Sequence, residues 1–403
     1  MQNPILVIGG GISGITTAIE IAEVGHEVVL VEKLPYLGGQ VIKFYEYFPK
    51  LCPPYCGLEI NFKRMRENPR IKYFTSSTVQ KISGEKGNYQ AIIRHDAQLV
   101  SNNCSACGAC VTVCPVEREN EYNYSLDKTK AIYLPHELAF PFKFTIDEKV
   151  CKKHGCAKCV KVCDYNAIDL DAQPTTTEMK FSSVVFATGW RPYDANKLEI
   201  LGFGKHPDII TNVMFERFSA PNGPTKGKLI KPSDGEVPKN VIFVQCAGSR
   251  DENHLPYCSA VCCSASLKHA LIVRKRIPDA RVRIFYIDLR VTGRNEDFLN
   301  RVKEDESIEL IRGKAGKVEM KGKDIYVIAE DIVAGKRLKT KADLVVLATG
   351  IVPSAVESMD NGTEGFLDHL QNGYIASGCA KRPMDVSASL KDATAAALKA
   401  IQP

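Results

Sequence analysis

The chain has 403 residues, of which 44% are hydrophobic, and a formal net charge of +6. This length suggests two or three globular domains, and the composition excludes a disordered chain. The scattered positive charge contains no dense basic tract, which argues against a nucleic-acid surface and permits an acidic protein partner. No apolar run of about 18 residues and no export signal is present, so we expect the 15 cysteines to be ligands in a reducing cytoplasm.

The first segment predicts a dinucleotide-binding unit. A buried strand runs into a glycine-rich turn and a helix-compatible segment, and a second apolar strand ends at an acidic residue. The first glycine permits the tight turn, the second lets the backbone approach a pyrophosphate, and the third lets the helix pack closely. The acid can accept hydrogen bonds from an adenosine ribose. In chain order these features are residues 5–8, Gly9, Gly11, Gly14, the helix 15–24, the strand 27–31, Glu32 and its neighbour Lys33.

Two further segments favour FAD over NAD as the bound dinucleotide. Gly38, Gly39 and Gln40 follow the acidic strand end, and residues 373–380, with Gly378 and Cys379, precede a helix over 386–401 that begins at Val386. Both segments resemble those of flavoproteins with two dinucleotide domains, in which a late strand ending in glycine presents the flavin to the next helix. The helix N-terminus would stabilise negative charge on the reduced flavin. We expect Cys379 to contribute only backbone there.

Two apolar strands that end in Ala-Thr-Gly, residues 184–189 and 344–350, resemble the strands that lead between the two domains of such flavoproteins. The predicted fold class is therefore α/β, a thioredoxin-reductase-like flavoprotein with an inserted ferredoxin-like domain. The expected FAD contacts on these strands are Thr188, Gly189, Thr349 and Gly350. The expected parts are the FAD domain (1–98), the iron–sulfur insert (99–175), a return strand (176–190), the second dinucleotide-type domain (191–343) and the end of the FAD domain (344–403).

Eight cysteines form two runs inside the predicted insert. The first run has the spacing C-x2-C-x2-C-x3-C-P, whereas the second opens with four intervening residues and has Asp164 in place of the proline. In two-cluster ferredoxins three close thiolates hold one 4Fe–4S cluster and the distant fourth holds the other. A zinc ribbon is the alternative for such cysteine pairs. The expected ligands are Cys104, Cys107, Cys110, Cys114, Cys151, Cys156, Cys159 and Cys163.

The second domain lacks a glycine-rich phosphate turn. Its first strand, 241–245, runs into a segment with one glycine, which argues against NADPH or NADH binding and leaves Asp288 as a solvated strand end. Four cysteines precede an expected helix over 265–276, and they could hold a third cluster. The alternative is that they only pack as small buried residues. These cysteines are Cys246, Cys258, Cys262 and Cys263.

Cys52 and Cys56 flank two prolines and a tyrosine. Their pairing invites comparison with the redox-active dithiol of disulfide reductases, in which a thiolate lies against the flavin. Their C-x3-C spacing differs from C-x4-C, and a rigid proline loop is an equally good interpretation.

The segment VQCAGSRDENHLPYCSAVCC, residues 244–263, resembles the signature of the heterodisulfide reductase A-subunit family, and the similarity extends to GCAKRPMDVSASLKDATAAA, residues 378–397. The resemblance implies that the four cysteines of the second domain hold a cluster. Within the family, PKLCPPYCGLEINFKRM, residues 49–65, together with the chain length, most resembles the A subunit of the quinone-interacting membrane-bound oxidoreductase complex.

That finer resemblance implies a cytoplasmic protein that lies at the inner membrane through partner B and C subunits. It would carry electrons between the menaquinone pool and adenylylsulfate reductase in sulfate reduction, with FAD and three 4Fe–4S clusters as cofactors. One alternative function is the flavin subunit, bifurcating or not, of a soluble heterodisulfide reductase that acts through Cys52 and Cys56. Another, of a different class, is a zinc-stabilised docking scaffold without redox activity.

Overall fold

The computed structural model describes residues 3–354, 356, 363–368 and 370–402. The chain divides into two compact units. The first comprises Met1–Lys43, Tyr55–Trp190 and Pro353–Pro403, and the second comprises Phe44–Pro54 and Arg191–Val352. No helix formed by these described residues is long and apolar enough to cross a membrane.

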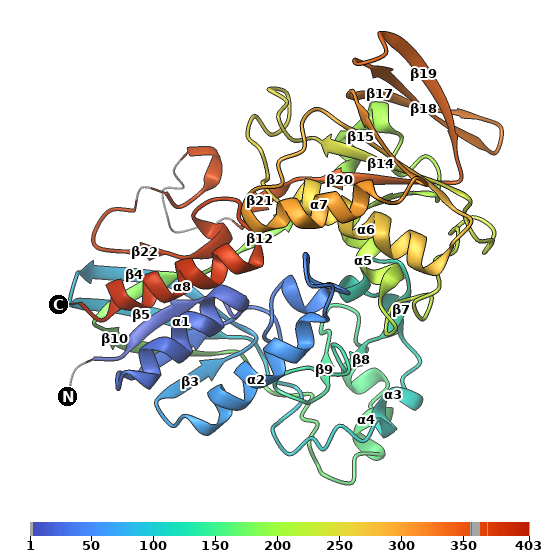
Figure 1. Ribbon diagram of the computed structural model, residues 1–403. Coiled ribbons are helices and arrows are strands. Elements are labelled where there is room, and N and C mark those ends of the chain that lie inside the picture. The colour runs from blue at the N-terminus through green and yellow to red at the C-terminus, as the bar shows by residue number, and fades with distance from the viewer. Residues whose placement is uncertain (1–2, 355, 357–362, 369, 403) are drawn as a thin grey trace. The chain divides into compact units, whose positions relative to one another are not determined.

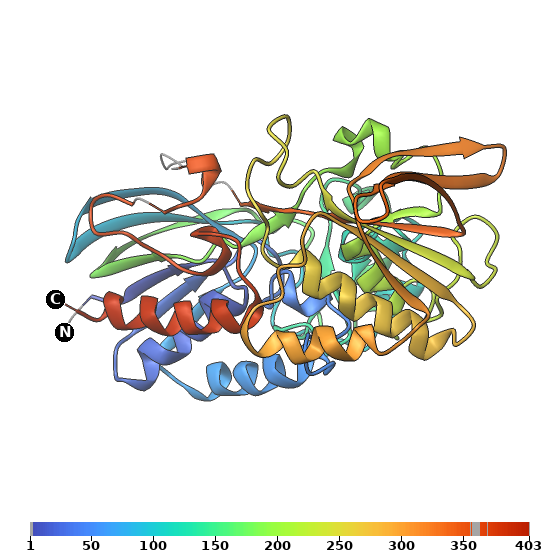
Figure 2. The same ribbon diagram turned by 45° about the horizontal axis from the view of Figure 1, so that its top comes forward.

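The first unit is built on a five-stranded parallel sheet with the strand order β22-β11-β1-β2-β3. Its three central strands, β11, β1 and β2, are almost fully buried, as expected for the middle of a sheet covered on both faces. Helices α1 and α8 lie side by side on this sheet (Figures 1 and 2), and the Thr17 hydroxyl of α1 donates to the carbonyl of Ala393 in α8 at 3.3 Å. The bounds are β1 (Ile5–Ile8), α1 (Ile12–Glu23), β2 (Val28–Val31), α2 (Pro54–Glu67), β3 (Ile71–Phe74), β11 (Ser183–Phe186), β22 (Ile375–Ala376) and α8 (Val386–Ala400).

A three-stranded antiparallel sheet covers the other face of the parallel sheet. Its strands are β4 (Ser77–Glu85), β5 (Asn88–His95) and β10 (Thr175–Phe181), in the order β10-β5-β4. Side chains of Tyr89 and Phe181 share one apolar core with Leu6 of β1. The expected return strand, 176–190, is thus two elements in two sheets, β10 and β11. In β10 exposed residues alternate with less exposed ones, which is typical of a half-buried antiparallel strand. This pattern explains why β10 lies in the antiparallel sheet and not in the buried parallel one.

The cysteine runs lie in an excursion of the chain between β5 and β10. His95 pairs with Thr175, so both ends of the excursion lie at the same place in the antiparallel sheet. Figure 1 shows its elements gathered together, around a small core of Val100, Cys110, Ile132 and Phe144. They are α3 (Ala109–Thr112), β6 (Glu117–Glu119), β7 (Lys128–Lys130), β8 (Ile132–Tyr133), β9 (Thr145–Ile146) and α4 (Lys158–Lys161).

The second unit repeats this plan with a parallel sheet of order β13-β20-β14-β15-β16 and an antiparallel sheet of order β17-β18-β19. One core joins the two sheets, and α6 and α7 lie together along the parallel sheet (Figure 2). The bounds are β13 (Ile209–Thr211), α5 (Asn212–Ser219), β14 (Asn240–Ala247), α6 (Cys262–Arg276), β15 (Arg281–Tyr286), α7 (Glu296–Lys303), β16 (Ile308–Arg312), β17 (Ala315–Lys321), β18 (Asp324–Asp331), β19 (Lys336–Ala342) and β20 (Leu344–Thr349). The chain passes from one unit to the other within two short strands, β12 (Trp190–Pro192) and β21 (Ile351–Pro353). These two strands pair with each other.

The unit boundaries differ from those expected in two places. Strand β20 pairs with β14, Val241 opposite Leu344, so residues 344–352 belong to the second unit and not to the end of the FAD domain. Residues 44–54 also belong to the second unit, although they were expected within the FAD domain. The Ala-Thr-Gly ending occurs on β11 and β20 alike, and therefore does not distinguish the sheet to which a strand belongs.

Candidate functional site

The glycine-rich turn after β1 is dictated by close backbone packing. Gly9 has φ +109°, and a Cβ atom on it would lie 2.3 Å from the carbonyl oxygen of Ala187. A Cβ on Gly14 would lie 1.8 Å from the carbonyl oxygen of Gly9. A Cβ on Gly11, by contrast, would have as its nearest neighbour the Cα of Gly39 at 3.8 Å. The turn therefore leaves room in front of the first turn of α1, where backbone amides can bind a pyrophosphate.

Glu32 follows β2 and is fixed by two backbone amides. Gly10 N–H donates to Glu32 Oε2 at 2.6 Å, and Leu34 N–H donates to Oε1 at 2.8 Å. Burial raises the pKa of Glu32, and these two hydrogen bonds oppose the rise. Each carboxylate oxygen retains acceptor capacity, since a carboxylate has about four lone-pair sites. The residue thus fits a ribose diol, whereas its neighbour Lys33 is exposed.

The segment after Glu32 closes over the turn. Gly38 N–H donates to the carbonyl of Gly10 at 2.8 Å, and a Cβ on Gly39 would lie 2.8 Å from the Cα of Gly11. Gln40 is held by the Tyr124 hydroxyl, which donates to its Oε1 at 3.0 Å, and by the carbonyl of Trp190, which accepts from its Nε2 at 3.4 Å. Glycines are therefore required on both sides of the candidate phosphate position.

The last part of the first unit brings a second glycine to α1. Gly378 has φ +66°, and a Cβ on it would lie 2.1 Å from Ser13 Oγ. Its N–H donates to Asp392 Oδ2 at 2.8 Å. The neighbouring Ser377 hydroxyl is buried and has no hydrogen-bond partner among the described residues, as expected of a group that a ligand would satisfy. These observations fit a bound flavin next to the dinucleotide turn.

Helix α8 begins at Val386, and the Asp385 carboxylate accepts from Ala388 N–H at 2.7 Å to cap it. Cys379 is buried and its Sγ donates to the carbonyl of Met384 at 3.3 Å; burial raises the pKa of this thiol. An inert, protonated thiol agrees with a backbone role for Cys379. On the strand β11 side, the Thr188 hydroxyl donates to the carbonyl of Ser354 at 3.4 Å and Gly189 has φ +69°.

Thr349 and Gly350, two of the expected FAD contacts, lie in the second unit. The Thr349 hydroxyl donates to Asn212 Oδ1 at 2.9 Å, and its carbonyl accepts from Cys262 Sγ at 3.7 Å. A Cβ on Gly350 would lie 2.4 Å from Ser249 Oγ. Their surroundings are therefore those of the third cysteine set, because β20 pairs in the second sheet.

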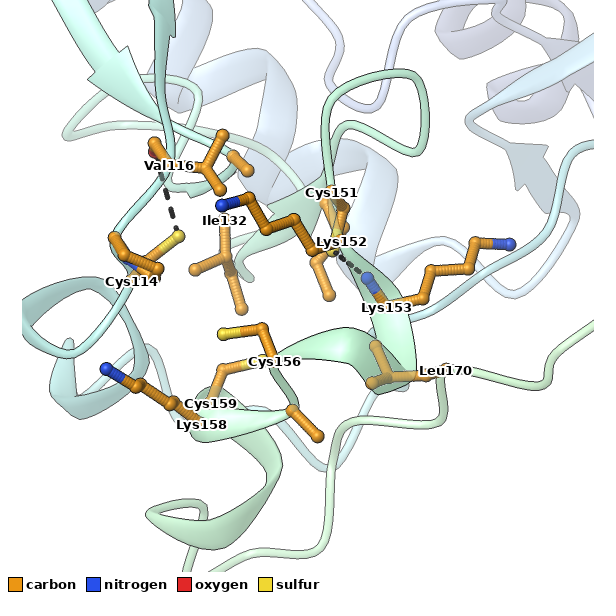
Figure 3. Close-up of a pocket in the computed structure, with 14 residues that line it drawn as sticks. Cys114, Val116, Ile132, Cys151, Lys152, Lys153, Cys156, Lys158, Cys159 and Leu170 are labelled. Atoms are coloured by element: carbon orange, nitrogen blue, oxygen red, sulfur yellow. Dashed lines mark hydrogen bonds between the residues drawn. The ribbon is translucent and has the colours of Figure 1, made fainter.

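The two cysteine runs of the excursion line two separate cavities, and each cavity takes its fourth cysteine from the other run. One cavity is lined by Cys114 together with the first three cysteines of the second run, Cys151, Cys156 and Cys159 (Figure 3). A second cavity is lined by Cys163 together with Cys104, Cys107 and Cys110. This exchange is the arrangement of two-cluster ferredoxins.

The irregular start of the second run is accommodated by a short 3-10 helix, Lys153–Gly155, and by Ala157, which has φ +47°. Backbone amides point at two of the sulfur atoms. Lys153 N–H donates to Cys151 Sγ and Ala167 N–H to Cys163 Sγ, both at 3.4 Å. Such amide bonds to cysteine sulfur are among the factors that set cluster potentials. They suit thiolate ligands better than thiols, which are weak acceptors.

A third set of cysteines gathers where β14 meets α6. Cys246 ends β14 with φ +53°, Cys258 lies in the connecting loop, and Cys262 and Cys263 form the first turn of α6. Burial raises the pKa of Cys246 to about 11. Burial is also the main cause of the raised pKa of Cys262, to which the charges of the other three cysteines add. The four sulfur atoms therefore lie within electrostatic range of one another, at a helix N-terminus that favours negative charge.

Polar groups surround this third set. Ala260 N–H donates to Cys258 Sγ at 3.4 Å, in the same i to i+2 geometry as at Cys151. Asp288, expected to be a solvated strand end, forms ion pairs with Arg250 and, at 3.1 Å, with Arg290. Within the described residues, no group of three or more His, Cys, Asp and Glu side chains is arranged to hold a single metal ion.

Cys52 and Cys56 are both exposed. Cys52 belongs to the second unit, and Cys56 lies in the first turns of α2 in the first unit. The C-x3-C segment therefore spans a unit boundary.

A buried polar cluster in the second unit was not expected from the sequence. Glu216 of α5 accepts from Lys268 Nζ, from His269 Nε2 at 2.6 Å and from Tyr45 N–H at 2.9 Å. Lys268 also donates to the carbonyl of Glu46 at 2.8 Å. Isolated charged residues on short helices carry no sequence signal that would reveal this contact. The cluster attaches residues 44–54 to the second unit.

The fold and the expected flavin cofactor agree with known proteins. A family model described as FAD dependent oxidoreductase matches residues 4–82. The thioredoxin reductases of Lactococcus lactis and T. acidophilum share the fold, with TM-scores of 0.53 and 0.51 at 14% and 11% identity, over 99% and 98% of this chain and 97% of each of theirs. The predicted thioredoxin-reductase-like α/β fold is thus confirmed.

Curated relatives are similar over almost the whole chain. It is 34% identical to the A subunit of the H(2):CoB-CoM heterodisulfide,ferredoxin reductase of Methanothermobacter thermautotrophicus, over 99% of this chain and 63% of that protein. It is 36% identical to an iron-sulfur A subunit of the CoB–CoM heterodisulfide reductase of Methanopyrus kandleri, over 98% of this chain and 63% of that protein. The chain thus spans about 63% of the length of these relatives. Together with the FAD match, they confirm the predicted class, an oxidoreductase.

Proposed function

We propose that this chain, whose homologues are heterodisulfide reductase A subunits, is the flavin and iron–sulfur subunit of a similar multi-subunit oxidoreductase. It holds one FAD and three 4Fe–4S clusters. The observation that carries the proposal is the exchange of Cys114 and Cys163 between the two cavities, which is the ligand pattern of a two-cluster ferredoxin. The full-length similarity to A subunits supports the same assignment.

The residues of the first unit bind and orient the flavin. The amides at the start of α1 bind the pyrophosphate in the space in front of Gly11, and Glu32 accepts hydrogen bonds from the ribose. Gly378 and the start of α8 lie at the isoalloxazine end, where the positive end of the helix dipole stabilises charge that develops on reduction. The bound FAD supplies the coupling of two-electron chemistry to one-electron carriers.

The cysteine sets provide those one-electron sites. Apolar side chains such as Ile132 and Phe144 exclude water from the first two cavities, and amides that donate to cysteine sulfur adjust the potentials of the clusters. At the third set, Arg250 and Arg290 offset part of the negative charge of the thiolates.

The finer assignment is a second candidate. Residues 49–65, with Cys52 and Cys56, resemble the A subunit of the quinone-interacting membrane-bound oxidoreductase complex. On that assignment the partners are B and C subunits, menaquinone through the membrane subunit, and adenylylsulfate reductase. Anaerobic isolation at native levels distinguishes the two candidates. A co-purifying haem-bearing membrane subunit favours the quinone complex, and co-purifying soluble thiol-reductase subunits favour the heterodisulfide type.

Cofactor analysis of the anaerobically purified chain tests the main proposal. We expect one FAD and about twelve iron atoms per chain, with matching acid-labile sulfide. Iron far below that value, or zinc in its place, would contradict the three-cluster assignment and favour the scaffold alternative. Cys379→Ala serves as a control, because it removes a buried cysteine outside the three sets. Its iron content should equal that of the wild-type chain.

A separate experiment tests a dithiol role. If Cys52 and Cys56 react with a disulfide substrate, Cys52→Ser and Cys56→Ser each abolish disulfide turnover while FAD and iron contents stay at wild-type values. Unchanged turnover would leave the segment as a rigid connection between the units.

A further inference from the structure

The two cysteine runs of the first unit differ sharply in charge. Residues 101–114, which contain the first run, include no charged side chain. Residues 149–161, which contain the first three cysteines of the second run, include five lysines, one histidine and no acidic residue. Both runs serve the same kind of cavity, so ligand geometry does not explain the difference.

The lysines lie at one of the two cavities. Lys152, Lys153 and Lys158 line the cavity of Cys114, Cys151, Cys156 and Cys159 and are drawn around it in Figure 3. The cavity of Cys163 and the first run is lined by no charged residue at all. Among the residues that line the two cavities, lysines therefore occur at one cluster position only.

Most of these lysines are not used inside the chain. Lys153 forms an ion pair with Glu148 at 3.1 Å. The other four, Lys149, Lys152, Lys158 and Lys161, are exposed, and in the described part of the chain none of them forms an ion pair. We call these four side chains the lysine ridge. Keeping four like charges close together without partners costs stability through mutual repulsion, so a function outside the chain is the economical explanation.

Exposed apolar side chains accompany the ridge. Val150 and Val160, which lie among the ridge lysines in the sequence, are 37% and 40% exposed. Val160 lies within α4, between Lys158 and Lys161. Apolar side chains surrounded by charges of one sign are typical of transient protein interfaces, in which charge steers the approach and apolar contact completes it.

We propose that the lysine ridge is the docking surface for an acidic electron-transfer protein, and that electrons enter or leave the chain through the cluster held by Cys114, Cys151, Cys156 and Cys159. This inference rests on the proposed function, because it requires a cluster in that cavity. One electron passes between the reduced centre of the partner and this cluster, and no bond or proton changes place. An acidic protein is favoured over an anionic membrane because two of the four ridge lysines, Lys152 and Lys158, line a candidate redox site, and the ridge is not formed by a long amphipathic helix.

The association rate of the holoprotein with a small acidic two-cluster ferredoxin, used as the probe, tests the proposal. Electrostatic steering raises association rates by factors of about 10 to 1,000 and is screened by salt. We expect Lys158→Glu with Lys161→Glu to slow association at least about tenfold at low ionic strength, and to have little effect near 1 M salt, where the screening length is about 3 Å.

The matched control is Lys81→Glu with Lys180→Glu, which makes the same change in net charge on the antiparallel sheet outside the excursion. It should leave the association rate within about twofold of wild type. Zero-length carbodiimide crosslinking provides a readout that does not depend on turnover, and crosslinks should map to the ridge lysines and disappear in the Lys158 and Lys161 variant.

Three outcomes overturn the docking proposal: equal slowing by both double variants, crosslinks located elsewhere, or ridge-dependent sedimentation with phosphatidylglycerol vesicles without any effect on the ferredoxin. Iron content, measured on every variant, separates this proposal from the proposed function. If the wild type lacks iron, the proposed function fails. If iron is present in all variants and the reversal changes nothing, only the docking surface fails.

Discussion

Replacing Glu216 by Gln should destabilise the second unit through its buried ion pair with Lys268. Burial alone would raise the pKa of Glu216. The charges and hydrogen bonds of Lys268 and His269 outweigh that effect and lower the pKa from 4.5 to about 2. Burial lowers the pKa of His269, so the imidazole stays neutral and donates through Nε2. The pair is thus a Glu carboxylate and a Lys ammonium in a buried site.

The pKa shift sets the size and the pH range of the effect. At about 1.4 kcal/mol per pKa unit, lowering from 4.5 to about 2 corresponds to about 3 kcal/mol. Because the folded-state pKa is depressed, this stabilisation is present above about pH 4.5 and is lost as the pH falls toward 2. Glu216→Gln removes it at neutral pH and leaves the Lys268 ammonium buried without a counter-charge, which typically costs about 3 to 5 kcal/mol.

Differential scanning calorimetry at pH 7 measures this effect. For a unit of this size about 1 kcal/mol corresponds to roughly 2–4 °C, so the transition of the second unit should fall by about 6–20 °C. The double variant Glu216→Gln with Lys268→Met removes both charges and should recover much of the loss. A fall of less than about 2 °C, or a double variant no more stable than the single one, would refute the reasoning.

Three further changes test the first unit. Gly14→Ala places a Cβ 1.8 Å from the carbonyl oxygen of Gly9 and should abolish FAD retention on gel filtration. The control Gly57→Ala, whose added Cβ would have no neighbouring atom within 4 Å, should retain FAD. Equal retention by the two variants would contradict the packing argument. Cys163→Ala should remove about four of the about twelve iron atoms and leave the cluster beside the lysine ridge in place. Adding Lys158→Glu to this variant should then lower the reduction potential of that cluster. An unchanged potential would place the ridge at the other cluster. Asp385→Ala removes the 2.7 Å hydrogen bond that caps α8. It should lower the free energy of local opening in the first turn of α8, measured by amide hydrogen exchange, by about 1 kcal/mol. Unchanged protection would show that packing alone fixes the start of the helix.

Local rules made the dinucleotide turn predictable from sequence. Gly9 and Gly14 are required by contacts within a few residues or across one strand, and those contacts follow from the strand–turn–helix geometry itself. The helix begins at Ile12, three residues earlier than expected, because the turn ends directly at its N-cap, Gly11. The cysteine spacing was informative for the same reason, since each set of three ligands comes from one short segment.

The unit boundaries could not be predicted because they depend on distant contacts. Residues 44–54 are attached to the second unit by Glu216 and Lys268, about 170 and 220 residues along the chain, and neither belongs to a recognisable motif. Likewise, β20 has the same apolar sequence pattern as β11, and only its pairing with β14 decides its sheet. Thr349 and Gly350 belong to the second unit for this reason, and their contact with the flavin stays a prediction.

On the proposed function, the third cysteine set would hold a cluster at the helix end that faces a nucleotide in a dinucleotide domain. In a dinucleotide domain the helix after the first strand directs its N-terminal amides at a pyrophosphate. In the second unit, that helix is α6, and its first two residues are Cys262 and Cys263. A pyrophosphate and a thiolate-bound cluster are both anionic, and both gain from the positive end of the helix dipole. Cys246, near the end of β14, has a left-handed backbone with φ +53°, and residues 248–261 then connect β14 to α6. The N-terminus of α6, which in a dinucleotide domain would face a pyrophosphate, can therefore present thiolates to iron.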